Sequence, residues 1–294
     1  MKTAMHTDRL ERRFGAIGAV RMLGEAGFEA VDYSMYYPDI AVFGRGGRIL
    51  AGELSRVAAS YGMVINQTHA PFSDFKRGEE SCEHNRKVYN SICEAIRISA
   101  AIGAKAVVVH PAEICPYLTA DERFDMNMEL FAHLISVARG EGIDISIENL
   151  YSRHLSNRDR IIKGVCSDSY ELLRYLDALS EYGVSFCLDV GHAELAGEGA
   201  YSMIKTLGKR ISYVHIHDND INSDEHTLPY LASIDFDGVC KALGKIGYDG
   251  DITLEADGFL RDMPDAVVPS ALSFARNIAS HLRDEVVRYR EKYS

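Results

Sequence analysis

The sequence predicts a single (β/α)8 barrel, a TIM barrel of the α/β class, over residues 1–294, with a C-terminal helix packed outside the barrel. Strand patterns alternate with helix patterns from one end of the chain to the other. Eight such units in 294 residues match the usual size of this barrel. A doubly wound sheet is the rival fold, but no glycine-rich phosphate loop follows the first strand.

The first half of the chain contains four predicted strands, and glycines mark the ends of the helices between them. Gly27, Gly62 and Gly103 each follow a helical pattern and precede an apolar stretch, as helix C-caps do. The fourth strand contains three consecutive valines, which is typical of a buried parallel sheet. We expect strands over residues 3–6, 28–33, 63–69 and 106–110, and helices over residues 14–26, 48–61 and 88–102.

The second half of the chain continues the same alternation. Asp168 and Glu171 have the spacing of a capping box, which predicts that a helix begins there. We expect strands over residues 143–148, 184–189, 211–217 and 251–255, and helices over residues 123–140, 168–182, 198–208, 236–246 and 265–290.

The composition restricts the class of protein. A net charge of −11 disfavours a nucleic-acid partner, because phosphate backbones require a basic surface. The first ten residues lack the apolar run of a signal peptide, and no segment approaches the ~20 apolar residues of a membrane helix. The six cysteines are scattered without a C-x-x-C pair, which favours reduced thiols. We therefore expect a cytoplasmic protein that makes no membrane contact.

Ionisable side chains end six successive predicted strands. Active sites of TIM barrels gather at the C-terminal ends of their strands. One strand-end histidine is usually a hydrogen-bonded packing residue, but six ionisable groups at one level of an apolar barrel need partners. A shared cation would supply a partner to all of them. The six residues are His69, His110, Glu148, Asp189, His217 and Glu255.

The last four of these residues end four neighbouring strands and therefore form a candidate metal site. They offer three carboxylates and one imidazole, a set of donors that suits one divalent ion, Mn²⁺, Mg²⁺, Co²⁺ or Zn²⁺. The predicted ligands are Glu148, Asp189, His217 and Glu255.

Two other histidines lie close to these ligands in the sequence. His215 precedes His217 by two residues on the same face of the strand, and we expect it to pack beneath the site or to support a ligand. His192 follows Asp189 by three residues and is a candidate further ligand or donor to substrate oxygen. Gly191 between them is expected to let the backbone turn sharply.

Glu148 and Glu255 also suggest a reaction, because their strands are three apart and the two carboxylates would flank a bound ion. Such a pair can remove a proton next to a carbonyl on one face of a substrate and return it on the other, through an ene-diolate. This is epimerisation, or isomerisation if the proton returns to the neighbouring carbon. The alternatives are that both glutamates are ligands only, or that the barrel binds sugar or metal without catalysis.

Seven short motifs follow one another along nearly the whole chain. They are AGFEAVD (26–32), THAPF (68–72), VHP (109–111), IEN (147–149), LDVGH (188–192), HIH (215–217) and LE (254–255). In this order they resemble the sugar isomerase/epimerase superfamily with the xylose-isomerase-like barrel, which also contains endonuclease IV. The resemblance implies a metal-dependent isomerase or epimerase of a small sugar or sugar-like substrate, and a homo-oligomer. It places His192, His110 and His69 near the substrate.

Endonuclease IV resembles this pattern too, but holds three zinc ions. Its additional ligands match His69, His110 and His192, together with an Asp-x-His element that fits Asp224 and His226. The resemblance therefore implies an alternative, a multinuclear zinc phosphodiesterase. The acidic charge, the absence of Trp and the lack of a dense Lys/Arg cluster in the predicted loops favour a small-molecule substrate. Asp224 and His226 are expected to be either ligands of a second ion or polar residues of a lid.

The sequence of the loop after the seventh predicted strand leaves several classes of substrate open. Ketose 3-epimerases typically carry Gly-Glu and then Arg at this place, whereas this chain has Asp218-Asn219-Asp220 and no Arg. This difference leaves open the wider group, such as inosose or hydroxypyruvate-type isomerases and dehydratases. Three arginines after the fifth strand are candidate donors to a substrate phosphate, or else solvated loop residues. They are Arg153, Arg158 and Arg160.

Overall fold

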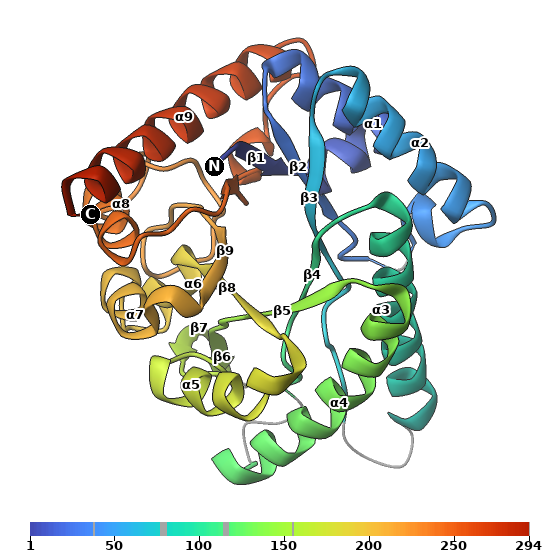
Figure 1. Cartoon of the computed structure of the whole chain (residues 1–294), viewed down its shortest axis with the longest axis vertical. Coiled ribbons are helices and arrows are strands. Elements are labelled where there is room, and N and C mark those ends of the chain that lie inside the picture. Colours follow the sequence, from blue (N-terminus) through green and yellow to red (C-terminus); the bar gives the residue numbers. More distant parts are fainter. Residues whose placement is uncertain (38, 77–80, 114–117, 155, 294) are drawn as a thin grey trace.

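The chain folds into a barrel of parallel strands surrounded by helices (Figure 1). This computed structural model describes residues 1–37, 39–76, 81–113, 118–154 and 156–293. Within these ranges eight strands form one sheet, in the order β10-β1-β2-β3-β4-β5-β8-β9. The strands are β1 (Thr3–His6), β2 (Ala30–Ser34), β3 (Val64–His69), β4 (Ala106–Val109), β5 (Asp144–Glu148), β8 (Ser185–Asp189), β9 (Ile211–His215) and β10 (Ile252–Leu254).

The barrel closes between β9 and β10 through a single parallel bridge, Ile216 with Leu254. The Ile216 N–H donates to the Thr253 carbonyl (2.9 Å), and the Glu255 N–H donates to the Ile216 carbonyl (3.0 Å). The closing contact therefore lies just beyond the end of β9. The predicted (β/α)8 barrel is confirmed.

Helices surround the sheet, as Figure 1 shows, and their apolar faces bury residues such as Ile96 of α3 and Leu134 of α4. The last helix, α9, lies against both α8 and α1, so it joins the two ends of the barrel on the outside. The α-helices are α1 (Asp8–Ala26), α2 (Gly47–Ser60), α3 (Cys82–Ile102), α4 (Ala120–Glu141), α5 (Ser169–Ala178), α6 (Val190–Leu195), α7 (Ala200–Leu207), α8 (Phe236–Ile246) and α9 (Val268–Tyr293). Short 3-10 helices cover Ala41–Phe43, Ser180–Tyr182, Gly208–Arg210 and Gly258–Leu260.

The structure differs from the predicted elements mainly where apolar periodicity is weak. α1 begins at Asp8, six residues before the predicted start, because the polar residues of its first turns carry no apolar periodicity. α6 directly follows β8 without a loop. The predicted helix 168–182 is divided into α5 and a 3-10 turn. A two-stranded hairpin that the sequence did not predict follows β5, and it comprises β6 (Ser152–His154) and β7 (Asn157–Ile162).

The predicted capping box at the start of α5 is only half formed. The Asp168 side chain accepts from the Glu171 N–H (3.0 Å), as a capping residue does. The Glu171 carboxylate instead accepts from the Cys166 N–H (3.0 Å) and fixes the preceding loop.

Polar side chains meet inside the barrel. Asp32 of β2 accepts from the Gln67 amide of β3 (2.9 Å) and lies 2.9 Å from His215 Nε2 of β9. β9 is a neighbour of neither β2 nor β3 in the sheet, so these contacts cross the barrel interior. All three residues are buried. The barrel is therefore polar in the layer that carries the strand-end residues.

No helix in the described ranges is long and apolar enough to span a membrane. The described cysteines carry free thiols, and Cys115 lies outside the described residues.

Candidate functional site

Four buried residues at the strand ends form the first cluster of the site, which we call the inner group. Each offers one donor atom, and these atoms lie within 4.8 Å of one another. Three of them were predicted as ligands from the sequence. The fourth is His215 and not His217, which belongs to a different cluster. The inner group consists of Glu148, Asp189, His215 and Glu255.

Strand register explains why His215, rather than His217, lies level with Asp189 in the barrel. β8 and β9 pair Asp189 with His215, so these two side chains lie at the same level of the barrel. His217 lies two residues further on, which is roughly 6–7 Å along an extended chain. His215 Nδ1 lies 3.2 Å from Glu148 Oε1 and 2.9 Å from Glu255 Oε2.

Asp32 holds the far side of the His215 ring, with Oδ2 at 2.9 Å from Nε2. A carboxylate on one ring nitrogen is the usual support for a histidine whose other nitrogen binds a metal. Burial alone would lower the pKa of His215, but Cys187 and the carboxylates of Glu255, Glu148 and Asp32 raise it well above its usual value.

Glu148 lies among imidazoles on both of its oxygens. Oε2 is 3.0 Å from His69 Nε2 and 3.2 Å from His110 Nε2, while Oε1 faces His215 and lies 3.6 Å from His192 Nδ1. Burial raises the pKa of Glu148, but His215 and His110 outweigh it and hold the pKa well below the usual value. The predicted residues His69 and His110 therefore both contact the inner group.

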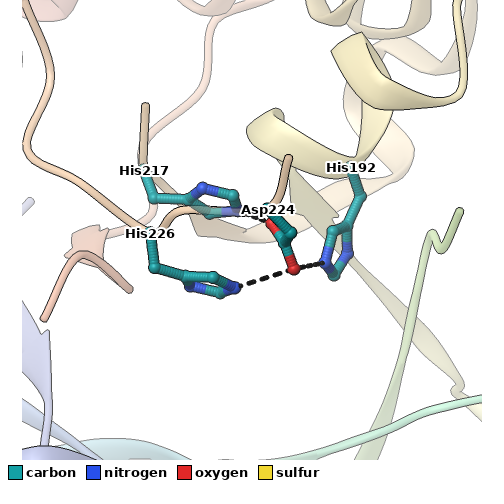
Figure 2. Close-up of side chains that lie close together, drawn as sticks. All are labelled: His192, His217, Asp224 and His226. Carbon is teal, nitrogen blue, oxygen red and sulfur yellow. Dashed lines mark hydrogen bonds and ion pairs between the residues drawn. The ribbon is translucent and has the colours of Figure 1, made fainter. Parts of the chain in front are cut away.

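A second cluster, which we call the outer group, contains the predicted residues that remain (Figure 2). Asp224 is at its centre, with Oδ2 at 3.1 Å from His226 Nε2 and 3.6 Å from His192 Nε2. Asp224 Oδ1 lies 3.8 Å from His217 Nε2. The rings of His217 and His226 stack at 4.0 Å. The outer group consists of His192, His217, Asp224 and His226.

The two groups are joined through Asp189. Its Oδ1 lies 3.1 Å from His217 Nε2 of the outer group and accepts from the His192 N–H at the start of α6. His192 Nδ1 lies 3.0 Å from the Asn149 carbonyl oxygen, which directs Nε2 toward Asp224. The site is therefore one continuous network and not two separate sites.

Charge balance holds the outer group together. Burial raises the pKa of Asp224, but His226 and His192 more than compensate and hold it well below the usual value. Burial lowers the pKa of His226, but Asp224 and Glu255 raise it well above the usual value. The pKa of His192 rises to about 10, because Asp189 and Asp224 outweigh its burial.

Gly191 has a different role from the predicted sharp turn. It lies inside α6, and a Cβ atom built there would come within 1.9 Å of His217 Cε1. Glycine is therefore required because the His217 ring packs directly on the α6 backbone.

Two buried oxygens indicate that the network suits a metal ion. Asp189 Oδ2 and Asp224 Oδ1 have no hydrogen-bond partner among the residues that the structure describes. A buried acceptor without a donor costs about 1–3 kcal/mol, and a divalent cation bound at each group would satisfy the oxygen of that group. Carboxylates with imidazoles suit Mn²⁺, Co²⁺ or Zn²⁺, and Mg²⁺ where oxygen donors dominate. The residues of both groups therefore fit a divalent ion.

A cavity of about 450 Å³ opens above these groups. His110, His192, Asp224, His226 and Glu255 face it from the network, beside an aromatic wall. Polar groups at the base of a partly apolar cleft are typical of a small-molecule site. The aromatic wall consists of Tyr36, Tyr37, Phe72 and Tyr151.

Sequence reasoning missed three residues that line this cavity, His6, Tyr36 and Asp257. His6 ends β1 and was within reach of the strand-end argument, which began only at the third strand. Asp257 follows Glu255 by two residues. Tyr36 lies beyond β2, and no pattern marks it.

The three arginines that were predicted as possible hydrogen-bond donors to a substrate phosphate differ in their positions. Arg153 lines the cavity, and its guanidinium lies 5.6 Å from the centre of the Tyr151 ring. Arg160 is exposed on β7. The side chain of Arg158 lies outside the described residues.

Several curated proteins are similar to parts of this chain. An uncharacterised protein of Methanocaldococcus jannaschii is 32% identical over 193 residues, which are 64% of this chain and 62% of that protein. A ketose 3-epimerase of Arthrobacter globiformis is 31% identical over 119 residues, 39% of this chain and 35% of that enzyme. A probable endonuclease 4 of Mycobacterium leprae is 29% identical over 138 residues, 46% of this chain and 48% of that protein. These alignments each span less than two thirds of the relative.

A structural comparison and a family model also match most or all of the chain. The crystal structure of a D-tagatose 3-epimerase-like protein superimposes with a TM-score of 0.72, at 22% identity, over 100% of both chains. The family described as xylose isomerase-like TIM barrel matches residues 20–278. The chain therefore belongs to the xylose isomerase-like TIM barrel family.

Proposed function

We propose that the protein is a divalent-metal-dependent isomerase or epimerase of a sugar or sugar-like substrate, which acts by proton transfer next to a carbonyl. One observation carries the proposal. Glu148 and Glu255 reach the same His215 nitrogen from strands three apart in the sheet, at 3.2 and 2.9 Å. Two carboxylates that converge in this way can act on the two faces of one substrate carbon.

In this proposal the residues of the inner group have distinct roles. Asp189 and His215 would hold the ion together with the two glutamates, and the ion would polarise substrate oxygens. Glu148 would take the proton from carbon on one side, and Glu255 would return one on the other. The aromatic wall of the cavity would exclude water from the reacting carbon. Similarity to a named ketose 3-epimerase and to an epimerase-like structure supports this reaction class.

A second candidate function is a multinuclear zinc phosphodiesterase. The outer group favours it, because His192, His217, Asp224 and His226 provide donors for an ion beyond the inner group. Two or more ions a few Å apart suit phosphoryl displacement. Similarity to a probable endonuclease 4 supports the same reading over less than half of the chain.

Solvent-deuterium incorporation separates the two candidates. The purified protein with Mn²⁺ is incubated in D₂O with a panel of ketoses, inososes and hydroxy-ketoacids, and exchange is followed by NMR. We expect exchange at carbon next to the carbonyl for at least one compound, and its loss in Glu148→Gln. Glu225→Gln is the matched control, since Glu225 is an exposed carboxylate of the same cavity outside both groups. No exchange on any compound, together with cleavage of a duplex with an abasic site, would support the phosphodiesterase instead.

A further inference from the structure

One wall of the cavity contains a chain of four buried polar residues, which we call the Tyr36 chain. Asp257 Oδ2 lies 3.1 Å from His6 Nε2, and His6 Nδ1 lies 3.2 Å from the Tyr36 hydroxyl. The Tyr36 hydroxyl donates to Glu255 Oε1. Each of the four residues is at most 7% exposed. The chain therefore ends on a carboxylate of the inner group.

The direction of the hydrogen bonds follows from the chemistry of the partners. A tyrosine hydroxyl has one proton, and Tyr36 donates it to the Glu255 carboxylate. Its oxygen is then left to accept from the Nδ1–H of His6. Asp257 lies against the other ring nitrogen and is itself fixed by the Arg9 N–H (2.7 Å). The two hydrogen bonds of Tyr36 thus have defined directions, and Asp257 faces His6 Nε2 as an ion-pair partner.

Packing fixes the Tyr36 ring as well as its hydroxyl. The ring stacks on Phe72, with centres 5.0 Å apart, and meets the His69 ring edge-on at 4.6 Å. A ring held on two sides keeps its hydroxyl in one place, so Tyr36 is suited to orient a neighbour.

The two glutamates of the inner group differ in what holds them. Both oxygens of Glu148 face imidazoles that belong to the network. Glu255 directs only Oε2 toward His215, because Oε1 accepts from Tyr36. A carboxylate at the end of a glutamate rotates readily about its last bond, so an unheld Glu255 would present either oxygen or both.

We propose that Tyr36 is the positioning residue for Glu255, and that His6 and Asp257 hold its hydroxyl in place. Tyr36 occupies Oε1 and leaves Oε2 as the one oxygen that Glu255 offers to an ion in the inner group. Tyr36 is not itself a ligand. This inference rests on the proposed metal-dependent function, because it assigns how one ligand of that site is oriented.

Co²⁺ binding to the intact chain tests the proposal through affinity and the visible absorption spectrum, which reports coordination number. We expect Tyr36→Phe to keep the fold, to change the spectrum toward higher coordination as Glu255 binds through both oxygens, and to weaken Co²⁺ binding about tenfold or more. Tyr33→Phe is the matched control. Its buried hydroxyl donates to Glu11 Oε1 (3.1 Å), away from both groups and from the cavity, and the variant should bind Co²⁺ as the wild type does.

A double variant distinguishes positioning from general destabilisation. His6→Phe should shift the spectrum in the same direction as Tyr36→Phe, and the two together should show no further change, since His6 acts through Tyr36. If the losses of Co²⁺ affinity in the two single variants add up in the double variant, His6 and Tyr36 act independently, and the Tyr36 chain does not work as a unit.

The remaining outcomes separate the two proposals. If Tyr36→Phe matches the wild type while Glu255→Gln weakens Co²⁺ binding, the positioning role is wrong and the metal site stands. If Glu255→Gln also matches the wild type, or the wild type binds no Co²⁺, the metal site itself is wrong and the positioning role falls with it.

Discussion

The inner and outer groups use the same kinds of side chain but are held in different ways. Every member of the inner group ends a strand or directly follows one, so the register of the parallel sheet fixes its level. In the outer group, Asp224 and His226 come from the long loop between β9 and α8. In that loop Ile221, His226 and Tyr230 have positive φ angles of 63°, 47° and 70°. Regular structure therefore holds the whole inner group, whereas a strained loop supplies Asp224 and His226 to the outer group.

Strain of this kind persists only where the surroundings enforce it. Asp218 does so, because its buried carboxylate accepts from the N–H groups of Ala232 (2.8 Å), Ser233 (3.1 Å) and Ile234 (3.0 Å). Its own backbone pairs with Thr227. The outer group should therefore respond to changes in the loop that leave the inner group intact.

The largest effect is expected from the inner group itself. Glu148→Gln and Asp189→Asn each remove a buried charge from the ion site, so both should lose bound metal and lower deuterium exchange on the order of 10²–10⁴-fold. Elemental analysis of the purified variants measures the metal, with Glu225→Gln as the control. Full retention of metal in both variants would show that the inner group is not an ion site.

Asp224→Asn is expected to affect the outer group alone. Asp224 is the carboxylate that joins its three histidines, so the variant should lose an ion bound there while Glu148, Asp189 and His215 keep theirs. The measurement is the number of ions per chain before and after the substitution. An unchanged ratio in a protein with one ion per chain would indicate that Asp224 and His226 cover the site without binding metal.

Asp218→Asn tests whether the loop holds the outer group. The loss of charge weakens the four backbone hydrogen bonds that this carboxylate accepts, from Asn219, Ala232, Ser233 and Ile234, so the free energy of unfolding should fall by about 1–3 kcal/mol. Urea unfolding measures the fall, and metal titration should show weaker binding to the outer group with the inner group unchanged. Asp220→Asn, an exposed acidic residue of the same loop, is the control. Equal effects of the two substitutions would contradict the role of Asp218.

Gly191→Ala should give the smallest of these effects. The new Cβ would displace the His217 ring by contact at 1.9 Å, which should weaken metal binding to the outer group about tenfold. Gly140→Ala on α4 is the control, because a Cβ there meets nothing within 4 Å. If both alanine variants bind metal alike, His217 has room to move and contributes little to the outer group.

The sequence predicted the barrel and most of the inner group because both depend on short-range patterns. Six successive strands, from β3 to β10, end in an ionisable residue or directly before one, and parallel strands place their ends at one rim. It predicted His217 as the ligand and His215 as a packing or supporting residue, and residues two apart lie on the same face of an extended chain. The choice depends on the pairing of β8 with β9, whose register shifts between Phe186 and Cys187. A shift of this kind leaves no mark in the apolar pattern.

The outer group and the Tyr36 chain were harder to predict from the sequence, for a different reason. Asp224 and His226 were identified only through a resemblance, since their positions depend on the backbone of a long loop. Tyr36 meets Glu255 across 219 residues of sequence, and no local periodicity connects them. His6, as a strand-end residue, could have been found from the sequence by extending the same argument to β1.

The backbone bridge that closes the barrel joins the sequence neighbours of two inner-group residues. Ile216 follows His215, and Leu254 precedes Glu255, so the last joint of the ring is flanked by two proposed ligands. An ion bound by both His215 and Glu255 would stabilise this bridge. At a free-ion concentration of 100 times Kd, binding would stabilise the folded state by about 2.7 kcal/mol. Amide hydrogen exchange at Ile216 and Glu255 should then slow as the ion is added, which makes the seam of the barrel a reporter of occupancy.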